Sequence, residues 1–320
     1  MPTNTPKTAS KSASTVAAPD PSRDASPDLS TVASPDTPPR PTPHPLDLAL
    51  ALHPASTDPA QAGRYTGRTS ADYWNMVGPF GGITAGLALQ AVMQHPQRLG
   101  EPIALTVNFA GAMAAGDFEV EAVPVRTNRS TQHWTVTLTH RDADGQRLVS
   151  TTATAVTALR RPTWGAQEAV MPAAPAPASL ARGRRPRRGV AWLDQFDQRP
   201  IVGEVPDRWD GQGGADSLSL LWLRDHPPRP LDYPALAGLS DLFFPRIWLR
   251  RACFVPLGTV SMAVYFHADA AQLAATGSGY LLGQARGQGF GGGFFDHSGQ
   301  LWNEAGVLLA TTHQIVYYKE

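Results

Sequence analysis

The sequence predicts an α+β fold that is built twice, with one long helix and an antiparallel β-sheet in each half. Three observations support this prediction: two apolar helix-like segments, a series of strand-like segments after each of them, and local similarity between the halves. The segment GGITAGLALQAVMQHP (residues 81–96) has helical composition, a glycine-rich start and a proline at its end. The segment YPALAGLSDLFFPRIW (residues 233–248) predicts a second helix that has almost no polar face.

Strand-like segments with turn residues between them follow each predicted helix. In the first half they are PIALTVNFAGAM, DFEVEAVPVRT, QHWTVTLTHRD and RLVSTTATAVTA. In the second half they are GTVSMAVYFHA, GYLLGQARGQGF, GGGFFDHSG and GVLLATTHQIVYY. Both halves therefore have the order helix, then strands, which predicts two α+β units of the same design.

Three short matches between the halves occur in the same order and indicate a duplicated domain. AGLAL at 85–89 matches AGLSD with an offset of 152 residues, and LTVNF at 105–109 matches MAVYF with an offset of 157. LVSTTATAV at 148–156 matches LLATTHQIV with an offset of 160. Each match alone would be weak, because short apolar strings recur by chance.

Because of the duplication, each half serves as a control for the other. Three positions of the second half carry polar side chains where the first half has less polar or less versatile ones. In this alignment Asp241 replaces Leu89, Thr259 replaces Pro102 and Gln314 replaces Thr154. A helix packed across an antiparallel sheet could bring the three polar side chains together.

The composition narrows the class of protein. The chain of 320 residues has 27 basic and 27 acidic residues, so it has no net charge to attract nucleic acid or an acidic membrane. Its one cysteine, Cys253, excludes an internal disulfide framework and a thiolate metal cage. It has no apolar run of membrane-spanning length and no secretory signal at its start. We therefore expect a soluble cytoplasmic protein.

The chain divides into four predicted parts. Residues 1–60 are rich in Pro, Ser, Thr and Ala and are predicted to be disordered. Residues 61–160 and 190–320 are the two predicted domains, and 161–189 form a Pro-, Ala- and Arg-rich linker on the surface. The arginines of the linker could suggest nucleic-acid binding, but no aromatic residues interleave with them, which favours a solvated linker.

Asp241 is the residue that points to chemistry. A carboxylate in apolar surroundings must find partners, raise its pKa or take part in a reaction. Together with the hydroxyl of Thr259 and the amide of Gln314, it is suited to hold and activate a water molecule. The structural alternative is an acid that pairs with a local donor. The G-x-S-x-G motif of serine hydrolases is absent, so direct attack by water is the economical mechanism.

The chain resembles the TesB-like acyl-CoA thioesterases, which carry two hot-dog domains in tandem. The resemblance rests on GPFGGITAGLALQAV, PIALTVNFAGAM, LSDLFFP, GTVSMAVYFH and GVLLATTHQIVYY. It implies a tandem hot-dog fold and hydrolysis of acyl-CoA by a water that Asp241, Thr259 and Gln314 position, without a metal or redox cofactor. Typical members have Asp-His after the threonine, whereas this chain has Ser261 and Met262, so Ser261 is an alternative source of the hydroxyl.

The resemblance also suggests residues that contact the substrate. Gly81 and Gly82 could present backbone N–H groups to the thioester carbonyl, or they could simply form a tight turn. Phe243 and Phe244, with Trp248, are expected to line an apolar acyl channel. Arg250 and Arg251 could meet phosphates of coenzyme A, although arginines in a last helical turn usually complement the helix dipole.

The remaining predictions concern the histidines, the alternative functions and the oligomeric state. His267, His297 and His313 match no metal-ligand spacing and are predicted to be ordinary strand or turn histidines. A non-catalytic acyl-CoA-binding protein with the same fold is the main alternative function. An enoyl-CoA hydratase would need an Asp-x-Asn-Pro-x-His-like motif, which is absent. Association into a homodimer or a higher homo-oligomer is also expected.

Overall fold

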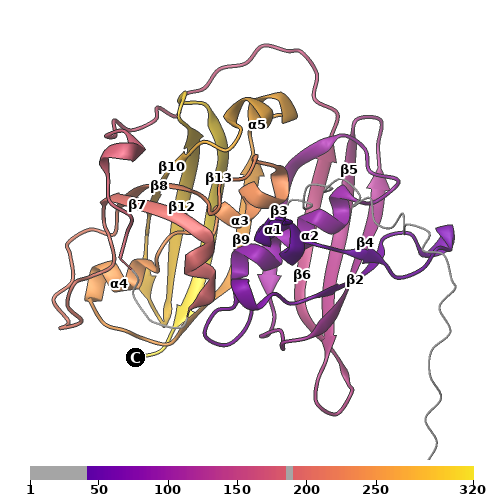
Figure 1. Cartoon of the computed structure of the whole chain (residues 1–320), viewed down its shortest axis with the longest axis horizontal. Helices are drawn as coiled ribbons and strands as arrows, with labels where there is room; N and C mark the ends of the chain where they lie inside the picture. Colours follow the sequence, from indigo (N-terminus) through magenta and orange to yellow (C-terminus); the bar gives the residue numbers. More distant parts are fainter. Residues whose placement is uncertain (1–41, 185–189) are drawn as a thin grey trace, which may run out of the picture. The chain divides into compact units, whose positions relative to one another are not determined.

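One antiparallel β-sheet runs through both halves of the chain (Figure 1). The computed structural model describes residues 42–184 and 190–320. Over these residues thirteen strands pair in the order β1-β2-β4-β5-β6-β3-β9-β13-β12-β10-β8-β7, and β11 pairs with β12. Residues 1–41, which are most of the tail predicted to be disordered, and residues 185–189 of the predicted linker lie outside the described residues.

The two halves contain similar elements. The first contains α1 (Pro45–Ala49), β1 (His53–Pro54), β2 (Arg64–Arg68), α2 (Gly81–Met93), β3 (Glu101–Phe109), β4 (Asp117–Thr127), β5 (Thr131–Arg141) and β6 (Arg147–Ala158). The second contains β7 (Phe196–Val202), β8 (Ser219–Asp225), α3 (Tyr233–Leu239), α4 (Arg246–Arg251), β9 (Leu257–Phe266), α5 (Ala270–Thr276), β10 (Leu281–Arg286), β11 (Phe290–Gly291), β12 (Phe294–Asn303) and β13 (Leu308–Tyr318). Short 3₁₀ turns occur at Pro59–Gln61, Ala71–Tyr73, Pro177–Ser179 and Ala191–Gln195.

Residues 45–54 correct the prediction that the whole of residues 1–60 is disordered. They form α1 and β1, and Leu46, Leu50 and Leu52 are buried. Asp47 also accepts a 2.8 Å hydrogen bond from Arg229 of the second half. The segment LDLALAL therefore buries enough apolar surface to offset the entropy lost on ordering it.

The second predicted helix is interrupted, which corrects the surroundings expected for Asp241. α3 begins after Asp232, whose carboxylate accepts a 2.9 Å hydrogen bond from the Ala235 amide, and ends at Leu239. Pro245 has no N–H and disfavours helical geometry in the residue before it, so the chain cannot continue the helix to α4. Asp241 therefore lies in the turn after α3, where its N–H donates to the Gly238 carbonyl at 3.1 Å.

The helices α2 and α3 pack against each other at glycines. A Cβ on Gly82 would lie 2.5 Å from the carbonyl oxygen of Gly238, and one on Gly86 would lie 3.1 Å from that of Pro234. The offset of 152 residues pairs Gly86 with Gly238 and Gly82 with Pro234, so an approximate two-fold axis relates the two contacts. The helices are therefore antiparallel, and the end of α3 lies beside the start of α2.

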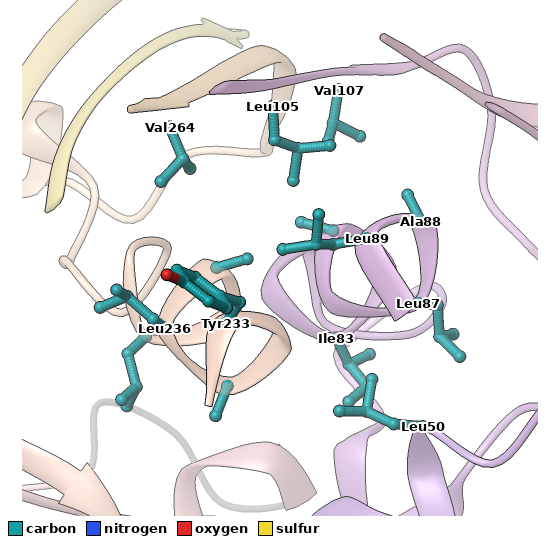
Figure 2. Close-up of a cluster of buried hydrophobic side chains, with 14 of the residues drawn as sticks. Leu50, Ile83, Leu87, Ala88, Leu89, Leu105, Val107, Tyr233, Leu236 and Val264 are labelled. Atoms are coloured by element: carbon teal, nitrogen blue, oxygen red, sulfur yellow. The ribbon is translucent and has the colours of Figure 1, made fainter. Parts of the chain in front are cut away.

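The strands that join the halves obey the same two-fold relation. Leu105 of β3 pairs with Val264 of β9, and Val107 pairs with Met262, as the offset of 157 residues requires. Figure 2 shows these strands above the two helices, with Leu89 of α2 pointing toward them. Most of the buried apolar side chains of both halves form one continuous core around these helices and strands. The register supports the duplication that the sequence indicates.

The pairing also corrects one position of the internal alignment. Pro102 pairs with Thr157 in the first half, and Thr259 pairs with Val316 in the second, each beside a bulge of one residue. Because Thr259 corresponds to Pro102, their partners Val316 and Thr157 also correspond to each other. Two residues earlier on the same strands, Gln314 therefore corresponds to Ala155 rather than to Thr154. Side chains on a strand alternate between faces, so an error of one residue reverses the face: Thr154 is exposed, whereas Gln314 is buried.

The linker contacts the outer face of the sheet in the second half, at β8 and β10. The indole N–H of Trp222 donates to the Pro175 carbonyl at 2.8 Å, and Met171 and Leu180 pack against the cluster that includes Trp222 and Leu282. Residues 171–180 are exposed or half-buried, so this part of the linker lies on the surface while Met171 and Leu180 make apolar contacts with the sheet. No helix among the described residues is long and apolar enough to cross a membrane.

Candidate active site

Asp241 and Gln314 form a hydrogen-bonded pair at the wall of a cavity. The amide nitrogen of Gln314 donates to Oδ1 of Asp241 at 2.7 Å and also lies 3.3 Å from the sulfur of Met262. Both hydrogens of the Gln314 amide therefore have acceptors, which fixes its orientation. The cavity has a volume of about 500 Å³ and is lined by residues of both halves, among them Gly81, Phe109, Asp241, Thr259 and Gln314.

Thr259 completes the predicted set of three. Its hydroxyl donates to Oε1 of Gln314 at 3.4 Å, so Gln314 links the hydroxyl to the carboxylate. The bulge at Val260 turns Thr259 toward the cavity, because an extra residue reverses the alternation of a strand. Ser261, the alternative hydroxyl, pairs with the exposed Ile315 and does not line the cavity. The structure therefore brings together Asp241, Thr259 and Gln314, and not Ser261.

The start of α2 contacts the carboxylate of Asp241. The helix begins at Gly81, and the side chain of Phe80 before it offers no capping hydrogen bond. Instead, the carboxylate of Asp241 accepts a hydrogen bond from the Gly82 amide. A Cβ on Gly81 would lie 2.7 Å from Oδ2 of Asp241. Gly81 lines the cavity, whereas Gly82 is buried against α3, so the two predicted substrate-binding glycines occupy different surroundings.

The surroundings of Asp241 favour its protonated form. Burial raises the pKa of Asp241 to about 7, although the hydrogen bonds from Gln314 and Gly82 partly oppose the shift. The side chain is still half-buried rather than sealed, because it faces the cavity. A carboxylate with a pKa near neutrality is well matched to accept a proton from water.

Comparison with known proteins identifies the family. A family model for the acyl-CoA thioesterase N-terminal domain matches residues 70–158, and one for the C-terminal domain matches residues 167–318. The chain belongs to the acyl-CoA thioesterase family. It is accordingly a thioester hydrolase, and the resemblance to TesB-like thioesterases is confirmed.

Solved structures confirm the tandem hot-dog fold of this thioesterase. A conserved protein of unknown function with a hot-dog fold from Alicyclobacillus acidocaldarius is 46% identical with a TM-score of 0.79, over 87% of this chain and 99% of that chain. The tesB protein of Mycobacterium avium subs paratuberculosis is 18% identical with a TM-score of 0.66, over 86% of this chain and 98% of that one. The acyl-CoA thioesterase II TesB2 of Mycobacterium marinum is 20% identical with a TM-score of 0.64, over the same shares. No curated protein matches the chain.

The predicted acyl-channel residues of the thioesterase also line the cavity. Phe243 and Phe244 are 6% and 7% exposed, and both face it together with Trp248. The ring of Phe243 lies over two glycines of the sheet, because a Cβ on Gly283 or Gly299 would come within 2.9 Å of it. The second half thus contributes both the polar trio and an aromatic wall beside it.

His297 lines the cavity, although its sequence pattern predicts only an ordinary strand or turn histidine. It lies on β12 directly opposite Gln314 of β13, is 3% exposed and lines the cavity. The alternation of β12 could have revealed its inward direction, since Phe295, His297 and Gly299 share one face. Its neighbour Gln314, however, lies 17 residues away in the sequence, so only the pairing of the strands brings the two together.

The arginines at the end of α4 have protein partners and do not line the cavity. Arg250 donates to the Ala215 carbonyl at 2.7 Å, and Arg251 pairs with Glu320 at 2.7 Å. Within residues 42–184 and 190–320, no group of three or more His, Cys, Asp or Glu side chains could hold a metal ion.

Proposed function

We propose that this thioesterase hydrolyses an acyl-CoA by direct attack of a water molecule that Asp241, Gln314 and Thr259 hold. The observation that carries the proposal is the 2.7 Å hydrogen bond between Gln314 and Asp241 at a cavity that also contains the start of α2. The bond leaves the oxygens of the Gln314 amide and of Thr259 available to orient the water. No side-chain nucleophile and no cofactor is needed for this reaction.

The first step forms a bond between the water oxygen and the carbonyl carbon. Asp241 accepts the proton that the water loses, and its pKa of about 7 places it near the value at which a general base is most effective. The carbonyl oxygen becomes negative in this step. The amide of Gly81, in the first turn of α2, is free of an intrahelical acceptor and lies where the helix dipole favours negative charge.

The second step breaks the bond between carbon and sulfur. The carbonyl re-forms, coenzyme A leaves as a thiolate, and Asp241 returns its proton to the sulfur. The products are a carboxylic acid and the free thiol of coenzyme A, and Asp241 is regenerated as a carboxylate. The acyl group would occupy the part of the cavity beside Phe243 and Phe244.

The release of free thiol from acyl-CoA esters of several chain lengths tests the proposal. We expect wild-type protein to release thiol and Asp241→Asn to lower kcat by about 10²- to 10⁴-fold. Asp225→Asn is a matched control, because Asp225 is also a buried aspartate whose pKa is raised to about 7, but it does not line the cavity. Equal thiol release by wild type and Asp241→Asn would contradict the proposal. Tight binding of acyl-CoA without turnover would support a non-catalytic binding protein instead.

A further inference from the structure

His297 is a buried polar side chain that has no hydrogen-bond partner within the described residues. Neither Nδ1 nor Nε2 of its ring is paired, although the side chain is only 3% exposed. Buried polar groups in proteins are almost always paired, because leaving one unpaired costs free energy. An imidazole that is unpaired in the free protein and faces the cavity is therefore a candidate to contact the substrate.

Packing holds the ring of His297 in place. The ring of Phe243 meets it edge to face, with the centroids 5.9 Å apart. Phe243 is itself confined against Gly283 and Gly299, whose missing side chains leave room for its ring. The position of His297 beside Gln314 is thus supported by both the sheet register and the aromatic contact.

The surroundings keep His297 neutral. Burial lowers its pKa to about 3, and the nearby guanidinium of Arg246 acts in the same direction, against the carboxylate of Asp296. A neutral imidazole has one nitrogen that donates and one that accepts. It therefore suits an uncharged oxygen, such as a hydroxyl or a ketone, better than a second carboxylate.

We propose that the thioesterase prefers acyl-CoA esters with a hydroxyl or oxo group on the third acyl carbon, which His297 binds through a hydrogen bond. This inference rests on the proposed function, since it takes Gln314 as the residue beside the reacting carbonyl. Neighbouring strands lie about 4.8 Å apart. The third acyl carbon lies about 2.5 Å from the carbonyl carbon. With a hydrogen bond of about 2.8 Å added, an oxygen on that carbon can contact His297 while the carbonyl lies beside Gln314.

Such a contact would act on selectivity rather than on the reaction itself. An unsubstituted acyl group would leave His297 unpaired in the complex, whereas an oxygen on the third carbon would satisfy it. The preference should appear in kcat/KM as a difference between substrates of equal length.

The test compares hexanoyl-CoA with 3-hydroxyhexanoyl-CoA and 3-oxohexanoyl-CoA, using wild type, His297→Phe and His297→Gln. We expect wild type to prefer at least one oxygenated ester by about tenfold, equivalent to ~1.4 kcal/mol. His297→Phe keeps the aromatic contact but removes both nitrogens, so it should lower kcat/KM for the oxygenated ester alone. His297→Gln should retain part of the preference. His313→Phe, an exposed position on the outer face of β13, should retain all of it.

Two results would overturn the inference. One is that wild type shows no preference among the three esters, a result that does not depend on the folding of a variant. The other is that His297→Phe lowers kcat/KM equally for all three esters. If no ester is hydrolysed, the proposed function fails, and titration calorimetry with the same intact esters still decides the inference. Tighter binding of an oxygenated ester that is lost in His297→Phe would support it. Equal dissociation constants would refute it.

Discussion

Gly81 and Asp241 approach so closely that a methyl group on Gly81 would lie 2.7 Å from Oδ2 of the carboxylate. The first residue of α2 must therefore be small for the turn after α3 to place Asp241 against that helix. The two residues belong to different halves of the chain, so the proposed site exists only because the halves pack together.

Gly81→Ala should lower thiol release without unfolding the protein. Its methyl group would displace the carboxylate, and a misplacement of about 1 Å costs on the order of 100-fold in rate. Alanine at a first helical position does not weaken the helix, so the melting temperature should change little. Steady-state kinetics and thermal melting would measure both effects. Gly165→Ala, where nothing lies within 4 Å, is the control, and full activity of Gly81→Ala would argue against the assigned place of Asp241.

The activity should rise with pH through a midpoint of about 7. Asp241 can accept a proton only in its ionised form, and burial raises its pKa to about 7. The value of kcat/KM should therefore fall about tenfold per pH unit well below the midpoint and level off above it, as for a single essential base. A profile measured between about pH 5 and 9 tests this expectation. An activity that is constant across neutrality would exclude Asp241 as the base.

Asp241→Asn should stabilise the protein above pH 7 while it lowers activity. The folded chain keeps the Asp241 proton up to about pH 7, whereas the unfolded chain loses it near the ordinary value of 3.8. Between these values the folded state binds more protons, so Asp241 makes stability fall as pH rises. The variant does not lose this stability. Its free energy of unfolding minus that of wild type should therefore be larger above pH 7 than near pH 4, by on the order of 1–3 kcal/mol.

Urea unfolding of both proteins at the two pH values would measure this gain. Asp225, whose pKa burial also raises to about 7, is present in both proteins, so its effect cancels in the comparison. If the difference in unfolding free energy between the two proteins does not change with pH, the pKa of Asp241 is not raised.

Thr259→Val should reduce kcat about tenfold, because it removes the hydroxyl that meets Gln314 but keeps the branched shape of the side chain. Ser261→Ala should change kcat less than twofold, since one hydroxyl away from the cavity contributes no binding to the water. The pair of variants separates the two hydroxyls that the sequence leaves as alternatives. The opposite ranking would show that the bulge at Val260 does not aim Thr259 as described.

Much of the fold follows from local patterns in the sequence. Glycine and proline mark the ends of α2, and the alternation of apolar residues marks β3 to β6, because these signals depend on neighbours in the chain. The internal repeat also predicts the two-fold relation between the halves. The interruption at Pro245 was available from the sequence but is obscured by the apolar residues around it.

The geometry of the proposed site depends on strand register and packing, which cannot be read from the sequence. Identification of Asp241, Thr259 and Gln314 needed only the comparison of the halves and the family resemblance. The sheet register showed that Ala155, not Thr154, corresponds to Gln314, because a shift of one residue reverses the face of a strand.

What the sequence by itself determined is the architecture, the family and the three polar residues, since apolar periodicity and repeated motifs are local properties. Only the tertiary structure decided that Gly81 abuts Asp241, that Thr259 rather than Ser261 faces the cavity, and that His297 lies unpaired beside Gln314. These contacts join distant segments. Their geometry arises from strand pairing and helix packing between residues far apart in the chain, so local sequence patterns do not predict it.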